Sequence, residues 1–121
     1  MMLIDCGSAE EARANVDDYV RDASSAGLEV SRGRFRDVRG GGRYGGHTWH
    51  TNFMIVVLRG GGVAVDGQGE EIAVKPGQGV FWSAGDWFAF EIGEGAETEA
   101  LTLQGADLDP RPGSCSTRCE A

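Results

Sequence analysis

Long apolar runs, positive charge and cysteine are all scarce in this chain. No apolar run approaches the ~18 residues that a membrane-spanning helix needs, so the sequence predicts no membrane span. The first residues lack the basic segment and apolar stretch of a secretory signal, which predicts no signal peptide. The cysteines are odd in number, and we expect them to be free thiols in a reducing, cytoplasmic setting: Cys6, Cys115 and Cys119.

Basic residues are outnumbered by acidic ones, 11 to 19, which gives a net charge of -8. Binding to phosphate backbones requires a basic surface, so the sequence disfavours a nucleic-acid partner.

Glycine, in contrast, is abundant. The 20 glycines lie at many separate points between short apolar runs, a pattern typical of short strands joined by tight turns. A chain of 121 residues fits one domain. We divide it into an N-terminal segment with a helix (1–27), a β-barrel (28–104) and a flexible polar tail (105–121).

The N-terminal segment has the pattern of an amphipathic helix. Ser8 and Glu11 are spaced as a capping box, apolar residues then recur at helical spacing, and Gly27 is a suitable stop. We predict one helix over about residues 9–25, packed outside the barrel.

After residue 27, apolar and polar residues alternate with a period of two, which is typical of a strand. A strand is predicted from residue 28 to 36, with Arg34 in its polar half, and a flexible loop over the glycine-rich residues 40–46. Further strands follow in short succession, and Asp66-Gly67 is a hairpin signal between two of them: 53–58, 63–65, 72–74, 80–82, 87–92 and 98–103. This spacing predicts an all-β sandwich or barrel.

Two motifs resemble those of a cupin, a small double-stranded β-helix (jelly-roll) barrel. Leu58-Arg59-Gly60 matches the end of the first cupin motif, and the stretch from Pro76 to Phe88 matches the second except for its histidine. The resemblance covers about half of the chain. It implies a cupin-like barrel and a homodimer, and the predicted helix makes this an all-β barrel with one N-terminal helix.

Three of the four positions at which a cupin places its metal ligands carry other residues. Counted from Gly60, His47 takes the position of the first ligand, whereas Trp49, Phe53 and Phe88 take the other three. Aromatic rings cannot supply the nitrogen and oxygen donors that a cation requires. We therefore predict an aromatic pocket without a metal or other cofactor.

His50 leaves an alternative open. Residues three apart on a flat strand face opposite sides, so His47 and His50 would both point inward only across a bulge, which the preceding glycines permit. The pair would then form a weak metal site. Otherwise His50 faces outward.

His47 is the candidate catalytic residue, because a neutral imidazole can act as a general base or a hydrogen-bond donor. The candidate substrate-binding residues are Trp49, Phe53, Phe88, Tyr44 and Arg34. Each of them also has a purely structural interpretation: core packing for Trp49, Phe53 and Phe88, a backbone hydrogen bond for His47, and a solvated edge strand for Arg34 and Tyr44.

These residues leave three functions open. The first is a metal-independent isomerase, cyclase or lyase that acts on a small hydrophobic or aromatic metabolite. The second is a non-catalytic ligand-binding or sensor module. The third is a metal-dependent enzyme that uses His47 and His50.

Overall fold

The computed structural model describes residues 1–5, 7–36, 42–93, 97–106 and 108, and the predictions for the three cysteines and for most of the tail lie outside these residues. The described part holds two helices, α1 (Ala9–Ala14) and α2 (Val16–Ser25), which follow the first strand. Its strands are β1 (Met2–Asp5), β2 (Glu29–Arg36), β3 (Gly42–Thr48), β4 (Phe53–Arg59), β5 (Gly62–Asp66), β6 (Glu71–Val74), β7 (Gln78–Trp82), β8 (Trp87–Ile92) and β9 (Glu97–Gln104).

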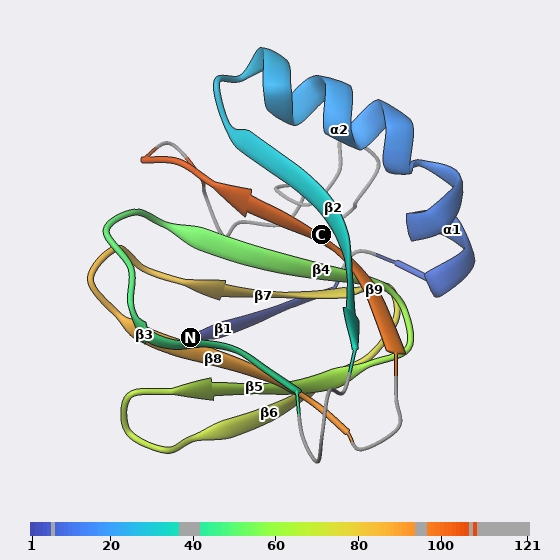
Figure 1. Cartoon of the computed structure of the whole chain (residues 1–121). Coiled ribbons are helices and arrows are strands. Elements are labelled where there is room, and N and C mark those ends of the chain that lie inside the picture. The colour runs from blue at the N-terminus through green and yellow to red at the C-terminus, as the bar shows by residue number, and fades with distance from the viewer. Residues whose placement is uncertain (6, 37–41, 94–96, 107, 109–121) are drawn as a thin grey trace.

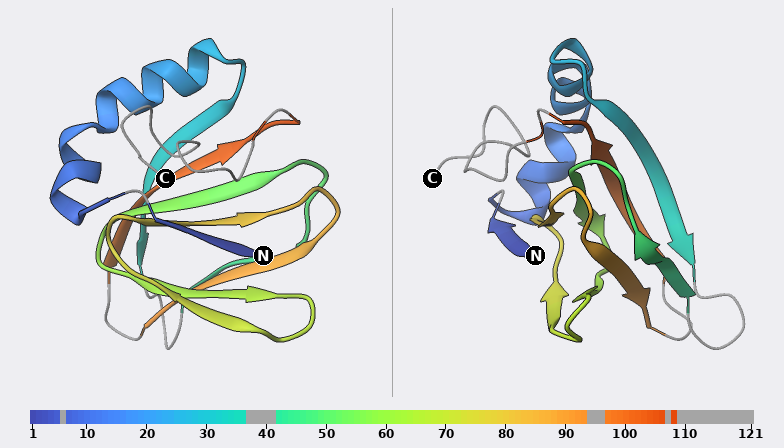
Figure 2. Two further views of the ribbon diagram at one scale, coloured as in Figure 1. Left: turned by 180° about the vertical axis from the view of Figure 1, so that it is seen from behind. Right: turned by 90° about the vertical axis from the view of Figure 1, so that its left-hand side faces the viewer.

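The strands form two antiparallel sheets that face each other (Figures 1 and 2). The five-stranded sheet has the order β1-β7-β4-β9-β2, and the four-stranded sheet has the order β3-β8-β5-β6. Non-sequential neighbours such as β4 and β9 show that the chain crosses repeatedly between the two sheets. The predicted all-β barrel is therefore what the chain forms.

Strand β4 shows why a continuous apolar run forms a strand here. Alternate side chains point to opposite faces of a sheet. Phe53, Ile55 and Val57 enter the core between the two sheets, whereas Met54 and Val56 enter a second core on the outer face of the five-stranded sheet. Because both faces are covered, no polar residue is needed along the strand.

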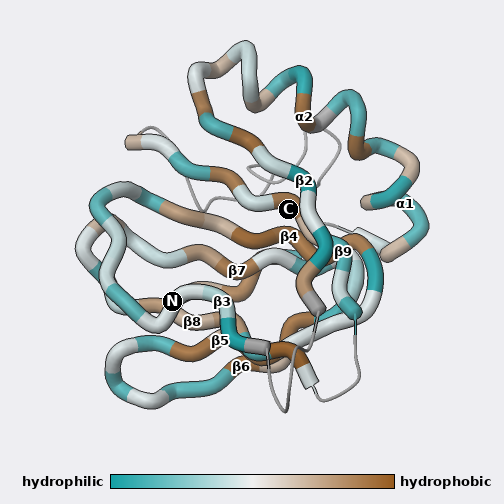
Figure 3. The backbone as a smooth tube through the Cα atoms, viewed as in Figure 1, coloured by the Kyte–Doolittle hydropathy of each residue, from teal (hydrophilic) through white to brown (hydrophobic). Residues whose placement is uncertain are grey.

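The helices cover that outer face (Figures 1 and 2). Apolar and polar segments alternate along α2 in Figure 3, and its apolar residues Val16 and Ala23 are buried against the sheet. The predicted single helix over 9–25 was wrong in one respect, because Asn15 interrupts it between α1 and α2. The predicted N-cap is confirmed: Ser8 Oγ accepts a hydrogen bond from the Glu11 main-chain N–H at 3.1 Å.

Two segments form strands that the sequence pattern did not predict. The segment 1–27 also supplies β1, which pairs with β7 at the edge of the larger sheet. Residues 42–46, predicted to be part of a loop, belong to β3, and residues 42–45 pair with β8. The glycines in this segment suit a β-bulge rather than a break in the sheet.

The motif glycine Gly60 is required by its surroundings. Its φ is +81°, which L-amino acids other than glycine rarely adopt, and a Cβ there would collide with the Glu97 carbonyl oxygen.

None of the helices in the described residues is long and apolar enough to cross a membrane.

Candidate binding cavity and active site

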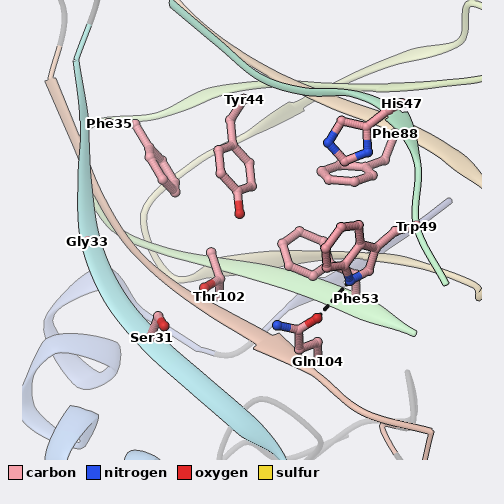
Figure 4. Close-up of a pocket in the computed structure, with 10 residues that line it drawn as sticks. All are labelled: Ser31, Gly33, Phe35, Tyr44, His47, Trp49, Phe53, Phe88, Thr102 and Gln104. Carbon is pink, nitrogen blue, oxygen red and sulfur yellow. Dashed lines mark hydrogen bonds between the residues drawn. The ribbon is translucent and has the colours of Figure 1, made fainter. Parts of the chain in front are cut away.

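A cavity of about 330 Å³ lies between the two sheets, where the edge strands β2 and β3 approach each other. Six ring-bearing side chains line one part of it: Phe35, Tyr44, His47, Trp49, Phe53 and Phe88. The remaining lining residues come from β2 and β9, and they are Ser31, Gly33, Thr102 and Gln104 (Figure 4). The volume is at the lower end of the range of about 300–1,000 Å³ that is common for ligand sites.

A bulge in β3 brings Tyr44 and His47 to the same cavity. Residues three apart on a regular strand point to opposite faces. The β3–β8 register shifts between Gly45 and His47, so Tyr44 lies opposite Phe90 and His47 lies opposite Phe88. Gly45 and Gly46, with φ values of +89° and +85°, make this shift possible. The extra residue turns His47 toward the cavity, which it lines while remaining exposed to solvent.

The main-chain contact of His47 determines which ring nitrogen carries a proton. Its Nδ1 lies 2.8 Å from the Thr48 carbonyl oxygen. A carbonyl can only accept, so Nδ1 must donate this hydrogen bond. In the neutral imidazole, Nε2 then has a free lone pair and can accept a proton.

The imidazole stands against the aromatic wall of the cavity. Its centroid is 5.3 Å from that of Phe88, with the rings nearly perpendicular, and 5.7 Å from that of Trp49. Figure 4 shows the ring nitrogen farther from the main chain pointing along the cavity toward the side of Tyr44. The free lone pair of Nε2 is therefore directed to where a ligand would lie.

Burial distinguishes the bottom of the cavity from its mouth. Phe53 and Phe88 are 4% and 3% exposed, and their centroids are 4.9 Å apart. Tyr44, in contrast, is 38% exposed and stacks on Phe35 at 5.0 Å. Partial burial raises the pKa of the Tyr44 hydroxyl, which remains protonated at neutral pH and can donate a hydrogen bond.

The polar wall of the cavity was not predicted from the sequence. Ser31 and Thr102 are direct cross-strand partners on β2 and β9. Gln104 follows on the same face, and its Oε1 accepts a hydrogen bond from Trp49 Nε1 at 2.7 Å. The available signal was the alternation of the two strands, in which Ser31 and Thr102 occupy the positions that face the barrel interior.

The structure gathers five of the six predicted site residues around this cavity: His47, Trp49, Phe53, Phe88 and Tyr44. Arg34 does not line it. It lies at an alternate position on β2 and forms an ion pair with Glu97, with 3.6 Å between Nη1 and Oε1. We therefore leave Arg34 out of the site.

His50 also lies outside the lining of the cavity, and its ring contacts Trp49 at 4.7 Å between centroids. Within the described residues there is no group of three or more histidine, cysteine, aspartate or glutamate side chains that could hold a metal ion. Cupins are known for metal sites, but one lining imidazole among rings, hydroxyls and an amide does not fit the donor set of such a site.

Comparisons with known proteins support the fold. No protein-family model matches the chain, and a search of curated proteins finds no match either. Among solved structures, the polyketide cyclase RemF from Streptomyces resistomycificus is 23% identical over 66% of this chain, with a TM-score of 0.54. A cupin-like protein from Thermotoga maritima is 16% identical over 66% of the chain, with a TM-score of 0.57.

A structure of dimethylsulfoniopropionate (DMSP) lyases is 25% identical over 69% of the chain, with a TM-score of 0.54. The matches span 55%, 58% and 43% of these three neighbours, so this chain corresponds to about half of their length. Together they show that the chain has the fold of a small cupin, as its two motifs predicted.

Proposed function

We propose that this protein binds a small apolar or aromatic metabolite inside the barrel and moves a proton on it without a metal ion, as an isomerase, cyclase or lyase would. The observation that carries this proposal is the position of His47. Its Nδ1 is occupied by the Thr48 carbonyl, which leaves Nε2 free beside the buried rings of Phe53 and Phe88.

The three reaction types have one step in common. His47 Nε2 removes a proton from a carbon next to a carbonyl, so that the C–H bond breaks and its electron pair moves onto the carbonyl oxygen. The proton then returns at another position, or after a ring closes or a leaving group departs. The Tyr44 hydroxyl, kept protonated by its raised pKa, can donate a hydrogen bond to the oxygen that gains charge.

The structural neighbours are compatible with this proposal. A polyketide cyclase and DMSP lyases are described among them, so related barrels accommodate cyclisation and elimination. Their similarity to this chain is low and covers only part of each protein. The proposal therefore depends on the residues around His47 rather than on these neighbours, since one fold hosts many activities.

The proposed step can be tested with a neutral aromatic ketone. We would follow exchange of the hydrogens next to the carbonyl of 2-tetralone in D₂O by NMR. The protein is expected to accelerate exchange, and His47→Ala is expected to reduce this acceleration by about 10²–10⁴-fold while 2-tetralone still binds. The matched control is His50→Ala, which removes the neighbouring imidazole outside the cavity and should keep the acceleration.

One observation favours the second candidate, a binding module without catalysis. The described hydrogen-bond partner of His47 is a main-chain carbonyl. A carboxylate in that place would make the imidazole a stronger base, and a carbonyl does so less. Binding of 2-tetralone without accelerated exchange would support this candidate. Equal loss in His47→Ala and His50→Ala would instead point to the two histidines acting together on a metal ion.

A further inference from the structure

One wall of the cavity carries a short row of uncharged polar side chains. Ser31 on β2 and Thr102 on β9 are paired directly across the two strands, and Gln104 lies two residues further along β9 on the same face. In Figure 4 all three lie on the side of the cavity opposite His47 and Tyr44. A ligand in the cavity would thus have a polar wall on one side and aromatic rings on the other.

Much of the hydrogen-bonding capacity of this row is unused. The indole N–H of Trp49 can only donate, so its 2.7 Å bond to Gln104 fixes the amide oxygen toward Trp49 and leaves the amide N–H groups free. Among the described residues, neither Ser31 nor Thr102 has a side-chain hydrogen-bond partner. Their hydroxyl groups line the cavity. The row therefore offers two hydroxyls and an amide donor to a ligand.

Formal charge is missing from the described cavity lining, which contains no lysine, arginine, aspartate or glutamate. The two arginines beside the lining residues of β2, Arg32 and Arg34, do not line the cavity and are paired with Glu99 and Glu97. An anionic or cationic ligand would lose its hydration without gaining an opposite charge. These surroundings favour a neutral ligand.

We infer that the ligand is an uncharged, flat aromatic or conjugated molecule with hydroxyl or carbonyl oxygens along one edge. That edge bonds to Ser31, Thr102 and Gln104, and the ring packs against Phe53 and Phe88. The opposite edge then faces His47. This inference rests on the proposed function, because it specifies the ligand of the same cavity.

The test compares three probes of one ring size by isothermal titration calorimetry at neutral pH. They are 2,3-dihydroxynaphthalene, unsubstituted naphthalene and the anion 3-hydroxy-2-naphthoate. We expect the diol to bind about tenfold more tightly than naphthalene, because it gains hydrogen bonds to the polar row. The naphthoate should bind more weakly than the diol, because its charge has no partner in the cavity.

Two variants link this preference to the row. Thr102→Val and Ser31→Ala remove a hydroxyl with little change in volume, and each should weaken binding of the diol several-fold while leaving naphthalene unchanged. Ser24→Ala is the matched control, because Ser24 is exposed on α2 and does not line this cavity. Equal affinity for the diol and naphthalene, tighter binding of the naphthoate, or an equal effect of the variants on diol and naphthalene would overturn the inference.

The proposed function fails under different results. Selective binding of the diol without any exchange of 2-tetralone would retain the ligand class and remove the catalytic role of His47. Exchange that depends on His47, with no preference for the diol, would retain the reaction and remove the role of the polar row. If none of the aromatic probes binds, both are wrong.

Discussion

Tyr44, at the mouth of the cavity, should make the free energy of unfolding depend on pH. Burial disfavours the phenolate and raises the pKa of Tyr44 above its ordinary value of 10.0. Above pH 10 the unfolded chain therefore releases this proton more readily than the folded chain, and the free energy of unfolding should fall as the pH rises. We expect wild type to lose more stability than Tyr44→Phe in urea unfolding on the alkaline side of pH 10. Parallel pH profiles for the two proteins would contradict this account.

The two glycines of the β3 bulge allow the cost of backbone strain to be measured separately from the cost of a steric clash. Both have a positive φ, but a Cβ on Gly45 would lie 2.6 Å from Phe88 Cε2, whereas a Cβ on Gly46 meets Arg43 Cδ at an ordinary 3.5 Å. Gly46→Ala should cost about 1–2 kcal/mol from the left-handed conformation alone. Gly45→Ala should cost clearly more and also displace Phe88 from the cavity. Urea unfolding of both variants measures the difference, and equal losses would show that the contact with Phe88 can relax.

At the scale of elements, a buried hydroxyl on β9 holds the turn between β4 and β5. Thr98 is fully buried, its Oγ1 donates to the Gly61 carbonyl at 2.6 Å, and the same Oγ1 accepts from the Gly61 N–H at 3.1 Å. Thr98→Val preserves the shape but leaves both main-chain groups without this partner.

The expected cost of Thr98→Val is about 1–3 kcal/mol of unfolding free energy, measured by thermal or urea unfolding. Thr102→Val is the matched control, because it removes the same hydroxyl from the same strand, where the group faces the cavity and has no hydrogen-bond partner among the described residues. A similar loss in both variants would mean that the Gly61 bonds contribute little.

Local sequence signals predicted most strands but not the site wall. The apolar run of β4 and the hairpin at Asp66-Gly67 are local features; Asp66 Oδ1 indeed accepts hydrogen bonds from the main-chain N–H groups of Gln68 and Glu70. The glycines of β3 predict a loop from the sequence alone, because a bulge and a break in a strand have the same composition. The pairing of Ser31 with Thr102 joins residues far apart in the chain, which strand periodicity alone cannot reveal.

At the scale of the whole molecule, β1 offers an edge for assembly. It pairs only with β7 among the described strands, and its side chains Met2 and Leu3 are 50% and 40% exposed. An open edge with apolar side chains tends to pair with another chain. We expect the homodimer that the motifs predicted to use this edge. Light scattering after size exclusion should give a dimeric mass for wild type and a monomeric mass for Leu3→Lys; a dimer in both would place the interface elsewhere.

Metal content tests the chemistry of the entire barrel. The part of the lining that the structure describes includes a single imidazole, and three aromatic side chains occupy the remaining positions that the motif comparison assigns to metal ligands. We expect purified wild type and His47→Ala both to carry far less than one metal ion per chain by plasma mass spectrometry, because rings cannot replace nitrogen and oxygen donors. About one equivalent in wild type that is lost in His47→Ala would mean that His47 binds a cation together with donors outside the described lining. The proton-transfer mechanism would then have to give way to one in which the cation polarises the substrate.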